Sequence, residues 1–529
     1  MWKRLGALAA LFGIAFSVMY MRIYLLTEEE DYKLVGNAQS SFTLNVSNTY
    51  GNIYDCRMRL LNNNTWKILA VLNPTAENVT DILPFVKNPD AFYAGLKKGV
   101  PFVCEVTSEE IPNENILTFK VPIRTSESQL APHIIGYTSD GKGVAGIEKA
   151  FNDFLRSHQS KISVKYEIDG LGNTLNGLNA SINMDEEMKA GVVTTIDAEI
   201  QKICEKAAQK MKKGAIVVMD PSNGQLRAIV SVPAFSPLNV SKSLDDPDSP
   251  LINRALMPYN VGSVFKLVTA AAALEQGISP DLTYECTGKI DVFGQIFKCH
   301  KESGHGVLDM QGAIVNSCNT YFINLSEKLS SENFIAKASS FGFGRSTVLA
   351  NGIVSEKGTL QSVEDLKNPA EKANMSFGQG VLTATPVQIA AMTSAIVNNG
   401  KLPKPQLIIG TTEDKQKVSF YENQTAFSEA TTPLIALKLR EFMAATVNEN
   451  AESLGRPKNT TAGGKTSTAQ TGRYDENGNE ILEAWFTGYF PIDKPKYVVT
   501  VLVEGGKSGN TDAAPIFKEI AENITNLYG

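Results

Sequence analysis

The chain has 529 residues, of which 43% are hydrophobic and 20% are charged, a composition typical of a globular protein with a large core. Its formal net charge is −6 and no run of basic residues stands out, which excludes nucleic acid as the main partner. A chain of this length usually forms roughly two or three domains.

The N-terminus predicts a membrane anchor. Lys3 and Arg4 precede a charge-free stretch from Leu5 to Met21, and Arg22 follows it. The stretch is longer than the apolar region of a signal peptide and ends in Met, Tyr and Arg rather than in small residues. We interpret residues 1–26 as a cytoplasmic stub and an uncleaved transmembrane helix; a cleaved signal peptide and a buried amphipathic helix are the alternatives. The positive-inside rule keeps the basic flank in the cytoplasm and the rest of the chain outside.

Residues 27–190 are polar, rich in Asn and Ser, and contain only short strand-like segments. Gly51–Asp55 is typical of a turn that leads into a strand, and Ala145–Phe151 of a short amphipathic helix. No residue cluster in this region suggests chemistry, so we expect a non-catalytic domain.

Residues 191–529 have the pattern of one α/β or α+β domain. Strand-like segments come from both ends of this region, and a helical middle separates them. Asp197 directly precedes a helical pattern and is expected to cap that helix. The expected elements are helices at Ala198–Met211 and Ala514–Leu527, strands at Ala215–Met219, Leu226–Val230, Ala484–Phe490 and Tyr497–Val503, and a turn at Asp220–Gly224.

Ser263 and Lys266 form the most informative short pattern in the chain. They open an apolar, alanine-rich stretch, Leu267–Leu274, that predicts a helix, so the hydroxyl and the amine share a face. A serine hydroxyl needs an adjacent base to become a good nucleophile, and a lysine shielded from water can serve as that base. Taken alone, the pair is a weak signal, because a lysine one turn after a serine near a helix start usually lies on a solvated face.

Two further segments offer polar groups that such a pair can use. Ser317 and Asn319 lie early in a predicted helix, Ala313–Leu325, and supply a hydroxyl and an amide. Gly463–Ala469 is typical of a strand entered through glycines, along which a lysine and hydroxyls alternate. This arrangement suits a carboxylate-bearing substrate laid beside the strand. Alone, each segment is also compatible with an ordinary polar helix turn or an edge strand.

Ser-x-x-Lys, Ser-x-Asn and Lys-Thr, in this order, resemble the motifs of penicillin-binding proteins and serine β-lactamases. The resemblance to class B penicillin-binding proteins is wider, and the anchor and Gly51–Asp55 are similar to that family's anchor and pedestal. It implies a transpeptidase fold in residues 191–529, with a central antiparallel sheet flanked by helices, and an elongated β-rich pedestal in residues 27–190. The segments that carry it are Thr194–Asp197, Val218–Pro221, Gly262–Ser263, Gly304–Gly306, Asn316–Thr320, Phe377–Gly380 and Gly463–Thr466.

The resemblance implies how the catalytic residues act. Ser263 attacks the carbonyl between two D-alanines of a peptidoglycan stem peptide, and Lys266 is its base. Ser317 and Lys465 help to pass the proton to the leaving amine, while Asn319 orients Lys266 and the substrate amide. The amine of a neighbouring stem peptide then takes the acyl group and forms the cross-link. This chemistry needs no cofactor.

The same resemblance implies how the substrate is held. Lys465 and Thr466 bind its terminal carboxylate, and the backbone N–H groups of Ser263 and Thr468 form the oxyanion hole. Ser467 stands where the family usually has glycine, and its side chain is expected to crowd a close backbone approach. Because this change removes no catalytic atom, we keep the expected activity and expect an effect on substrate or β-lactam affinity.

The resemblance also implies partners and a location. Peptidoglycan stem peptides are the substrates, β-lactams acylate Ser263 in their place, and the catalytic domain lies on the extracytoplasmic side of the cell membrane. A separate membrane glycosyltransferase and other proteins of cell-wall synthesis complexes are the expected partners. The alternatives are a D,D-carboxypeptidase or β-lactamase on the same scaffold, and a non-catalytic β-lactam sensor or scaffold.

Six cysteines in a protein expected outside the cytoplasm invite disulfides. Three thiolates and one imidazole lie in a short stretch, however, and such a set suits tetrahedral Zn²⁺. Some elongation-type members of the family are similar here, which implies a structural zinc that braces the helix of Ser317. The expected ligands are Cys286, Cys299, His305 and Cys318, with His300 as an alternative ligand; a Cys286–Cys299 disulfide, free thiols and a Cys56–Cys104 bridge are the other possibilities.

Overall fold

The computed structural model describes residues 2–28, 41–169, 174, 180–420 and 426–529. The chain divides into two compact units. Unit 1 contains residues 1–50, 63–124 and 158–188, and unit 2 contains residues 51–62, 125–157 and 189–529. Two segments of the predicted non-catalytic domain, 51–62 and 125–157, therefore pack with the C-terminal part of the chain.

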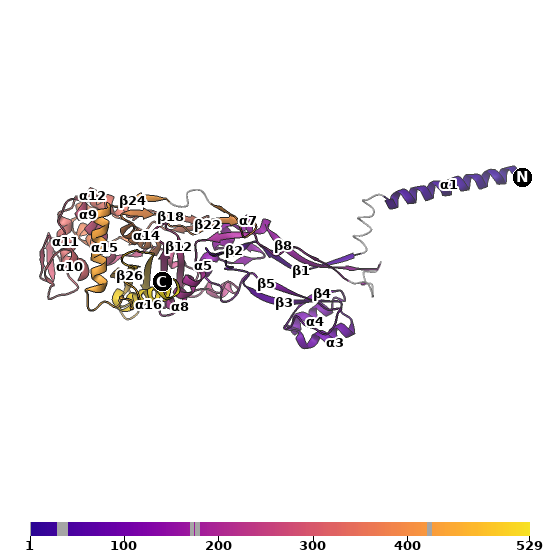
Figure 1. Cartoon of the computed structure of the whole chain (residues 1–529), viewed down its shortest axis with the longest axis horizontal. Helices are drawn as coiled ribbons and strands as arrows, with labels where there is room; N and C mark the ends of the chain where they lie inside the picture. Colours follow the sequence, from indigo (N-terminus) through magenta and orange to yellow (C-terminus); the bar gives the residue numbers. More distant parts are fainter. Residues whose placement is uncertain (1, 29–40, 170–173, 175–179, 421–425) are drawn as a thin grey trace. The chain divides into compact units, whose positions relative to one another are not determined.

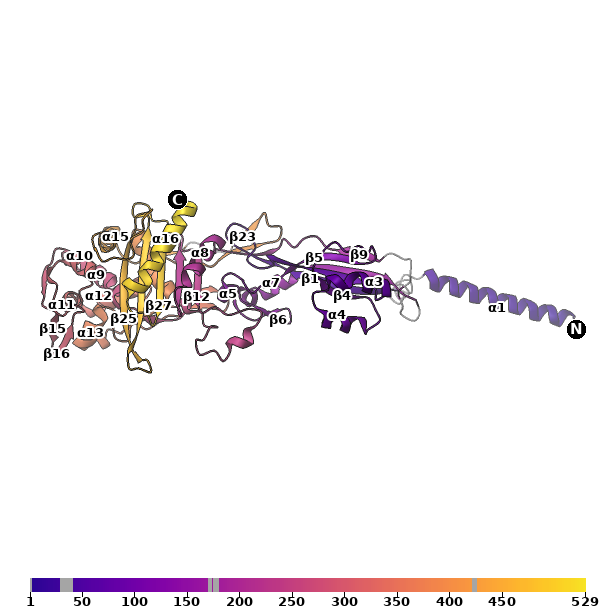
Figure 2. The ribbon, with the colours of Figure 1, turned by 90° about the horizontal axis from the view of Figure 1, so that it is seen from below.

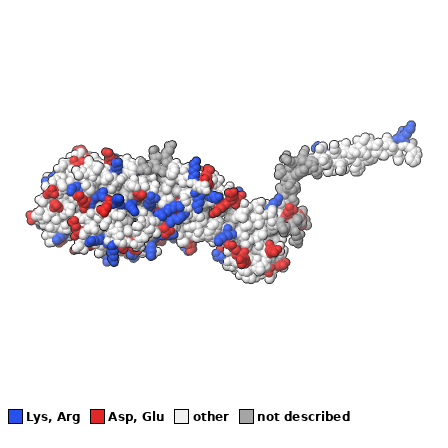
Figure 3. Space-filling view, in the orientation of Figure 1, with Lys and Arg blue, Asp and Glu red and all other residues white. Residues whose placement is uncertain are grey.

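The N-terminal helix α1 spans Trp2–Glu28 (Figure 1). It is long and apolar enough to cross a membrane, and its large apolar side chains are exposed from Trp2 to Leu25. In Figure 3 it is almost free of charged side chains, whereas acidic and basic side chains intermingle on the visible face of unit 2. The expected apolar N-terminal helix is thus confirmed.

Unit 1 contains two three-stranded antiparallel sheets, with strand orders β1-β8-β9 and β4-β3-β5. Strand β3 is apolar on both faces: Ala70 and Leu72 belong to one core cluster, while Leu69 and Val71 belong to a second one. This alternation follows from the two-residue period of a strand. The elements are β1 (Ser41–Tyr50), β3 (Thr65–Leu72), α3 (Ala76–Ile82), α4 (Pro89–Leu96), β4 (Phe102–Val106), β5 (Leu117–Ile123), β8 (Gln159–Glu167) and β9 (Ser181–Met184).

The largest sheet of unit 2 has five antiparallel strands in the order β12-β11-β27-β26-β25. The chain thus brings strands from residues 214–232 and 463–504 into one sheet, and the expected strands at both ends of the domain are confirmed. Its strands are β11 (Gly214–Met219), β12 (Leu226–Val232), β25 (Gly463–Tyr474), β26 (Glu480–Phe490) and β27 (Tyr497–Glu504).

Helices cover both faces of this sheet. On β11, Ile216 and Val218 pack in one core cluster with α8 and α16, whereas Ala215 and Val217 pack in another with α9 and α14. Figure 2 shows α16 lying across the strands. The helices of unit 2 are α5 (Pro132–Ile135), α6 (Gly146–Ala150), α7 (Asn152–Ser157), α8 (Ala198–Ala208), α9 (Lys266–Glu275), α10 (Met310–Val315), α11 (Asn319–Glu327), α12 (Ser331–Ser340), α13 (Pro369–Ser376), α14 (Pro386–Val397), α15 (Pro433–Asn448) and α16 (Ala514–Tyr528).

Short strands complete unit 2, including a second sheet in the order β2-β10-β22-β23. They are β2 (Asn52–Tyr54), β6 (Thr138–Ser139), β7 (Lys142–Gly143), β10 (Gly191–Thr194), β13 (Tyr259–Asn260), β14 (Tyr284–Cys286), β15 (Lys289–Val292), β16 (Gln295–Lys298), β17 (Gly306–Leu308), β18 (Thr347–Ala350), β19 (Ile353–Ser355), β20 (Thr383–Ala384), β21 (Lys401–Pro403), β22 (Ile408–Thr412), β23 (Val418–Phe420) and β24 (Phe427–Glu429).

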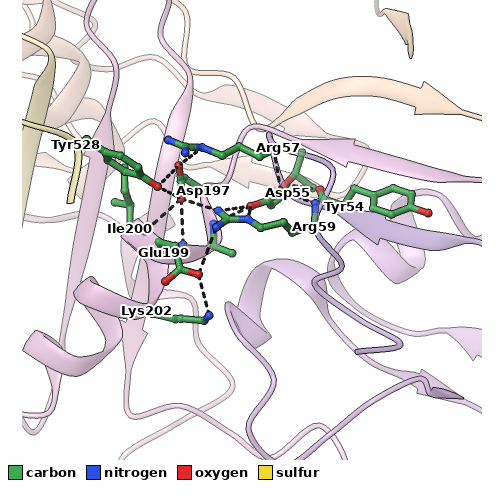
Figure 4. A network of polar contacts seen from close by, with 11 residues as sticks. Tyr54, Asp55, Arg57, Arg59, Asp197, Glu199, Ile200, Lys202 and Tyr528 are labelled. Carbon is green, nitrogen blue, oxygen red and sulfur yellow. Dashed lines mark hydrogen bonds and ion pairs between the residues drawn. The ribbon is translucent and has the colours of Figure 1, made fainter. Parts of the chain in front are cut away.

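An ionic network joins the 51–62 segment to the start of α8 and to the end of α16 (Figure 4). Asp197 caps α8 as expected, since its carboxylate accepts from the N–H groups of the first helical turn. The same carboxylate pairs with Arg57 at 3.1 Å and Arg59 at 2.9 Å, and accepts from the Tyr528 hydroxyl at 3.0 Å. Asp55 holds Arg59 from the other side. Each cation of the network thus faces at least one carboxylate.

Candidate active site

Ser263 lies in a short 3₁₀ turn, η4 (Gly262–Phe265), that runs directly into α9. Gly262 adopts a left-handed backbone conformation, with φ of 60°, and its N–H donates to Gly378 O at 2.8 Å. A Cβ atom on Gly378 would lie only 2.0 Å from Gly262 O. Glycine at both positions therefore allows two backbone segments to meet beside Ser263.

Lys266 is fully buried, and its Nζ donates to Ser317 O at 2.7 Å, Ser317 Oγ at 3.2 Å and Asn319 Oδ1 at 2.7 Å. The amine also lies 5.8 Å from the centre of the Phe322 ring. No carboxylate pairs with it among the described residues. Burial lowers the pKa of Lys266 to about 7, because a charged ammonium is costly away from water. Among the described residues, the Lys266 amine makes no hydrogen bond to the Ser263 hydroxyl.

Ser317 lies at a break between two helices, so the expectation of one continuous helix over Ala313–Leu325 was wrong. Helix α10 ends at Val315 and α11 begins at Asn319. Between them Ser317 adopts a left-handed conformation, with φ of 51°, and its N–H donates to Ile314 O. This backbone presents both the carbonyl and the hydroxyl of Ser317 to the lysine.

Lys465 comes from β25, the edge strand of the large sheet. It is fully buried, and its Nζ lies 3.1 Å from Ser317 Oγ and 2.9 Å from Thr466 O. Burial and the nearby Lys266 charge hold the pKa of Lys465 well below its usual range. The Ser317 hydroxyl therefore stands between two amines, each within hydrogen-bond distance, and has both an O–H donor and acceptor lone pairs to relay a proton.

A cavity of about 940 Å³ opens onto these groups. The two lysines lie behind its wall, whereas the predicted residues that line it are Ser263, Ser317, Asn319, Thr466, Ser467 and Thr468. Sequence reasoning missed Ile296, Phe297 and Lys298 of β16 and also Gln470, Leu482 and Asn510, which line the cavity as well. Phe377 and Gln379 carry a usable signal, because they belong to the family-like Phe377–Gly380 segment.

Ser467 and Thr468, the second and third residues after Lys465, lie in different surroundings. Thr468 is exposed, and its Oγ1 accepts from the Gly509 N–H at 3.1 Å. Ser467 is buried, and its Oγ donates to Val261 O at 2.9 Å. A Cβ atom on Gly262 would lie 2.3 Å from this Oγ. The hydroxyl of Ser467 therefore occupies space that Gly262 leaves free.

The four predicted metal ligands form one cluster beside Ser317. The ligand atoms of Cys286, Cys299, His305 and Cys318 all lie within 4.8 Å of one another. His305 Nδ1 is 3.5 Å from both Cys286 Sγ and Cys299 Sγ, and Cys299 Sγ is 3.9 Å from Cys318 Sγ. The contact between the last two thiols lowers the pKa of Cys299 and raises that of Cys318.

All six cysteines carry free thiols, so neither of the two disulfides considered from the sequence is present. His300 Nδ1 lies 3.9 Å from Cys299 Sγ, farther than His305 Nδ1 does. The cluster of three thiols and His305 is thus the arrangement that the structure brings together.

The fold and the Ser263–Lys266–Ser317–Lys465 arrangement define a known class of protein. Residues 214–522 match the family model of the penicillin-binding protein transpeptidase domain. The chain therefore belongs to the penicillin-binding protein transpeptidase family, and the expected fold is confirmed.

Individual relatives support this assignment. The chain is 33% identical to stage V sporulation protein D of Bacillus subtilis over 414 residues, covering 73% of this chain and 61% of the relative. It is 29% identical to the peptidoglycan D,D-transpeptidase MrdA of Haemophilus influenzae over 422 residues, covering 73% of this chain and 63% of the relative. The alignments thus span less than two thirds of either relative's own length.

A solved structure from work on the structural coordination of polymerization and crosslinking by a peptidoglycan synthase complex matches 99% of this chain and 99% of its own chain. The TM-score is 0.71 and the sequence identity is 23%. At this identity the likeness shows the fold.

Proposed function

We propose that this chain is a membrane-anchored D,D-transpeptidase that cross-links peptidoglycan stem peptides through an acyl-enzyme on Ser263. Ser263 attacks the carbonyl between the two D-alanines, Lys266 accepts the serine proton, and the terminal D-alanine leaves. Ser317 and Lys465 carry the proton to the leaving amine, and Lys465 with Thr466 holds the terminal carboxylate. The backbone N–H groups of Ser263 and Thr468 stabilise the oxyanion.

The surroundings of the Lys266 amine carry this proposal. The amine is fully buried, has no carboxylate partner among the described residues, and donates hydrogen bonds to Ser317 and Asn319. A structural lysine would be paired with an anion, because an unpaired buried charge is costly. An amine whose pKa is lowered to about 7 is suited to accept a proton near neutral pH. Its contacts with Ser317 connect it to Lys465 and so complete a proton path.

Covalent labelling with a fluorescent penicillin tests the acyl-enzyme. The full chain in detergent should be labelled with one equivalent, and Ser263→Ala should not be labelled. Ser241→Ala, which changes an exposed serine outside the cavity, is the matched control and should label like the wild type. A wild-type chain that stays unlabelled while a known penicillin-binding protein is labelled would contradict the proposal.

The acceptor decides between a transpeptidase and the hydrolytic alternatives. Incubation with a synthetic stem pentapeptide and a labelled D-amino acid should give the exchanged peptide, because an amine takes the acyl group. A carboxypeptidase would release D-alanine without exchange, and a β-lactamase would release hydrolysed β-lactam with steady turnover. Substantial turnover of a β-lactam would replace the transpeptidase proposal with the β-lactamase one.

The anchor and the partners follow from α1 and from the family. Helix α1 holds the protein in the cell membrane, with Lys3 and Arg4 in the cytoplasm and the catalytic unit outside. A separate membrane glycosyltransferase and other proteins of the cell-wall synthesis complex supply the glycan strands. A chain lacking residues 2–28 should remain soluble and fold, yet lose its flotation with liposomes; retention on liposomes would contradict the anchor.

The Cys286–Cys299–His305–Cys318 cluster is the proposed site of a structural zinc. Tetrahedral Zn²⁺ with Zn–S bonds of about 2.3 Å separates two sulfur ligands by roughly 3.8 Å, and Cys299 Sγ and Cys318 Sγ lie 3.9 Å apart. Cys318 follows Ser317 directly and stands at the start of α11. Bound zinc would therefore fix the backbone turn that carries the Ser317 hydroxyl, without taking part in the chemistry.

Elemental analysis of protein purified without chelator should find one zinc per chain. Cobalt substitution should give the visible thiolate-to-cobalt absorption bands of a tetrahedral site, and Cys299→Ser should abolish them. Cys204→Ser, which changes a buried thiol outside the cluster, is the control and should keep both the zinc and the bands. Absence of stoichiometric metal would contradict this site.

A further inference from the structure

Ser467 and Trp485 face each other directly across two strands of the large sheet. They are register partners in the antiparallel pair β25–β26. Both are buried, although each carries a hydrogen-bond donor that needs a partner inside the protein. Apolar side chains would fill this buried position without needing hydrogen bonds. The acceptors of the two donors therefore indicate what the polar pair does.

The two donors reach consecutive carbonyls of the same segment. Ser467 Oγ donates to Val261 O at 2.9 Å, and Trp485 Nε1 donates to Asn260 O at 2.8 Å. Asn260 and Val261 immediately precede Gly262 and the nucleophile Ser263. The sheet thus holds two consecutive residues, Asn260 and Val261, by hydrogen bonds just before Ser263.

Other contacts hold the same segment from its remaining sides. The N–H of Gly262 donates to Gly378 O at 2.8 Å, and β13, which contains Asn260, pairs with β20. The Tyr259 ring packs edge-on against Trp485, with ring centres 6.5 Å apart. The segment therefore cannot shift along or away from the sheet without breaking a buried hydrogen bond, whose loss leaves an unsatisfied polar group.

We propose that Ser467 and Trp485 are positioning residues that set the distance between the Ser263 turn and strand β25. This proposal rests on the proposed function, in which one oxyanion donor is the Ser263 N–H and the other is the Thr468 N–H. The first donor lies two residues after Val261, and the second lies one residue after Ser467. The Ser467–Val261 bond therefore ties the two halves of the oxyanion hole together at its base.

The hydrogen bond to Val261 O is a structural role that Ser467 can fill and that the family's usual glycine cannot. Glycine has no side chain that could reach Val261 O. Sequence reasoning expected the serine to crowd a close backbone approach; instead its hydroxyl is buried against Gly262 and donates to Val261 O. An oxyanion hole acts in the transition state, so its geometry affects the acylation step rather than the initial binding of ligand.

The test separates binding from acylation. The rate of Ser263 acylation is measured against fluorescent penicillin concentration, which gives a limiting rate constant and a half-saturation concentration. Ser467→Ala, which removes only the hydroxyl, should lower the limiting rate roughly 10-fold to 100-fold, since small misplacements of reacting groups have effects of this size. The half-saturation concentration should stay within about 2-fold of the wild type.

Trp485→Phe removes the second donor and keeps most of the ring. It should lower the limiting rate in the same way, and the double variant should lose less than the product of the two single effects, because both donors hold one segment. Ser467→Gly provides the family's usual residue at this position and should lower the rate at least as much as Ser467→Ala. Thermal unfolding of every variant is measured in parallel to report on the fold.

Thr500→Val is the matched control. It removes a buried hydroxyl that bonds to Thr487 at 2.8 Å in the same sheet, away from the Ser263 turn. Its limiting rate should be unchanged even if its unfolding temperature falls. The inference is overturned if Ser467→Ala acylates at the wild-type rate, or if Thr500→Val slows acylation as much as Ser467→Ala does. A wild-type chain that is not acylated at all would instead overturn the proposed function.

Discussion

Two polar clusters of unit 2 differ in whether their positively charged side chains are paired with carboxylates. In the network around Asp197, Arg57 and Arg59 each lie against a carboxylate. In the cluster around Ser317, the amines of Lys266 and Lys465 meet hydroxyl, amide and carbonyl oxygens, and no carboxylate pairs with either amine among the described residues. The Asp197 cluster pairs its positive charges with carboxylates, and the Ser317 cluster does not.

The pKa shifts follow this difference. Burial lowers the pKa of the Arg59 guanidinium, but its bonds to Asp55 and Asp197 outweigh burial and raise it. Burial also lowers the pKa of Lys266 and Lys465, and nothing of comparable strength opposes it. A paired cluster therefore contributes to stability, whereas an unpaired one costs stability and suits the proton transfers proposed above.

The largest expected effect comes from removing the unpaired charge. Lys266→Met should lower the rate of penicillin acylation by about 1,000-fold, in the range of general-base effects. It should leave the unfolding temperature unchanged or raise it, because a thioether of similar length replaces a buried amine without an anion. Stopped-flow labelling and thermal unfolding check both parts. A large loss of stability would show that Lys266 is structural.

The opposite result is expected in the paired cluster. Asp197→Asn keeps a good N-cap residue but removes the charge that binds Arg57 and Arg59. We expect a loss of about 1–2 kcal/mol in the free energy of unfolding, since both arginines are partly exposed and solvent screens their pairs. Penicillin acylation should be unchanged. A variant that folds normally but no longer acylates would place Asp197 in the catalytic machinery.

Lowering the pH should remove the stabilising contribution of the ionised Asp197 carboxylate. Burial raises the pKa of Asp197, but its bonds from Tyr528, the Glu199 N–H and the two arginines together lower it from 3.8. The stabilising effect of the ionised carboxylate is therefore fully present above pH 3.8 and is lost as the pH falls through the lower folded-state pKa. Urea unfolding at a series of acidic pH values should show the wild type converging on Asp197→Asn.

The unpaired cluster should show a pH dependence of rate near neutrality. With a pKa of about 7, Lys266 is mostly an ammonium below this pH and mostly a free amine above it. Acylation should fall about tenfold per pH unit below 7 and level off above it. Measuring the limiting acylation rate from pH 5.5 to 9 checks this. A flat profile across that range would contradict a base with this pKa.

Glu483 is an intermediate case and gives the smallest expected effect. Its Oε1 accepts from Arg473 at 2.9 Å, while its buried Oε2 has no hydrogen-bond partner in the described part of the chain. Burial and the nearby Glu504 raise the pKa of Glu483 to about 8. Its contribution to stability is therefore present below pH 4.5 and is lost as the pH rises through about 8.

Glu483→Gln should remove this loss, because the amide oxygen still accepts from Arg473 and carries no charge. At pH 9 we expect the variant to be at least about 1 kcal/mol more stable than the wild type, and at pH 4 equally stable, because the wild-type carboxyl is then mostly neutral in both states. Urea unfolding at both pH values checks the difference. Equal stability at pH 9 would show that Glu483 is ionised without penalty.

Local sequence patterns correctly predicted the helices and strands that depend mainly on residues close together in the chain. The apolar period of β11 and β12, the Asp197 cap and the apolar N-terminal helix were all correct. The helix predicted over Ala313–Leu325 was wrong, because a serine with positive φ has no sequence signature and the surrounding residues favour a helix. The motif order still pointed to Ser317 and Asn319, whose side chains both contact the Lys266 amine.

The contacts between distant segments were beyond local reasoning. Trp485 and Asn260 are 225 positions apart, so no local pattern links them. Strand alternation does indicate that Ser467 and Thr468 point to opposite faces, so the buried position of Ser467 had a usable signal. The family resemblance, which treated the residue as a replaced glycine, drew attention to crowding instead.

The left-handed backbone of Ser317 restricts which residues evolution can place there. Threonine carries the same hydroxyl, but its branched Cβ strongly disfavours a positive φ. Asparagine, aspartate and glycine tolerate that backbone and lack a hydroxyl. Serine is therefore the one common residue that fits both the helix break and the proposed proton path. Almost every point mutation at this position should then disturb the backbone turn or remove the hydroxyl.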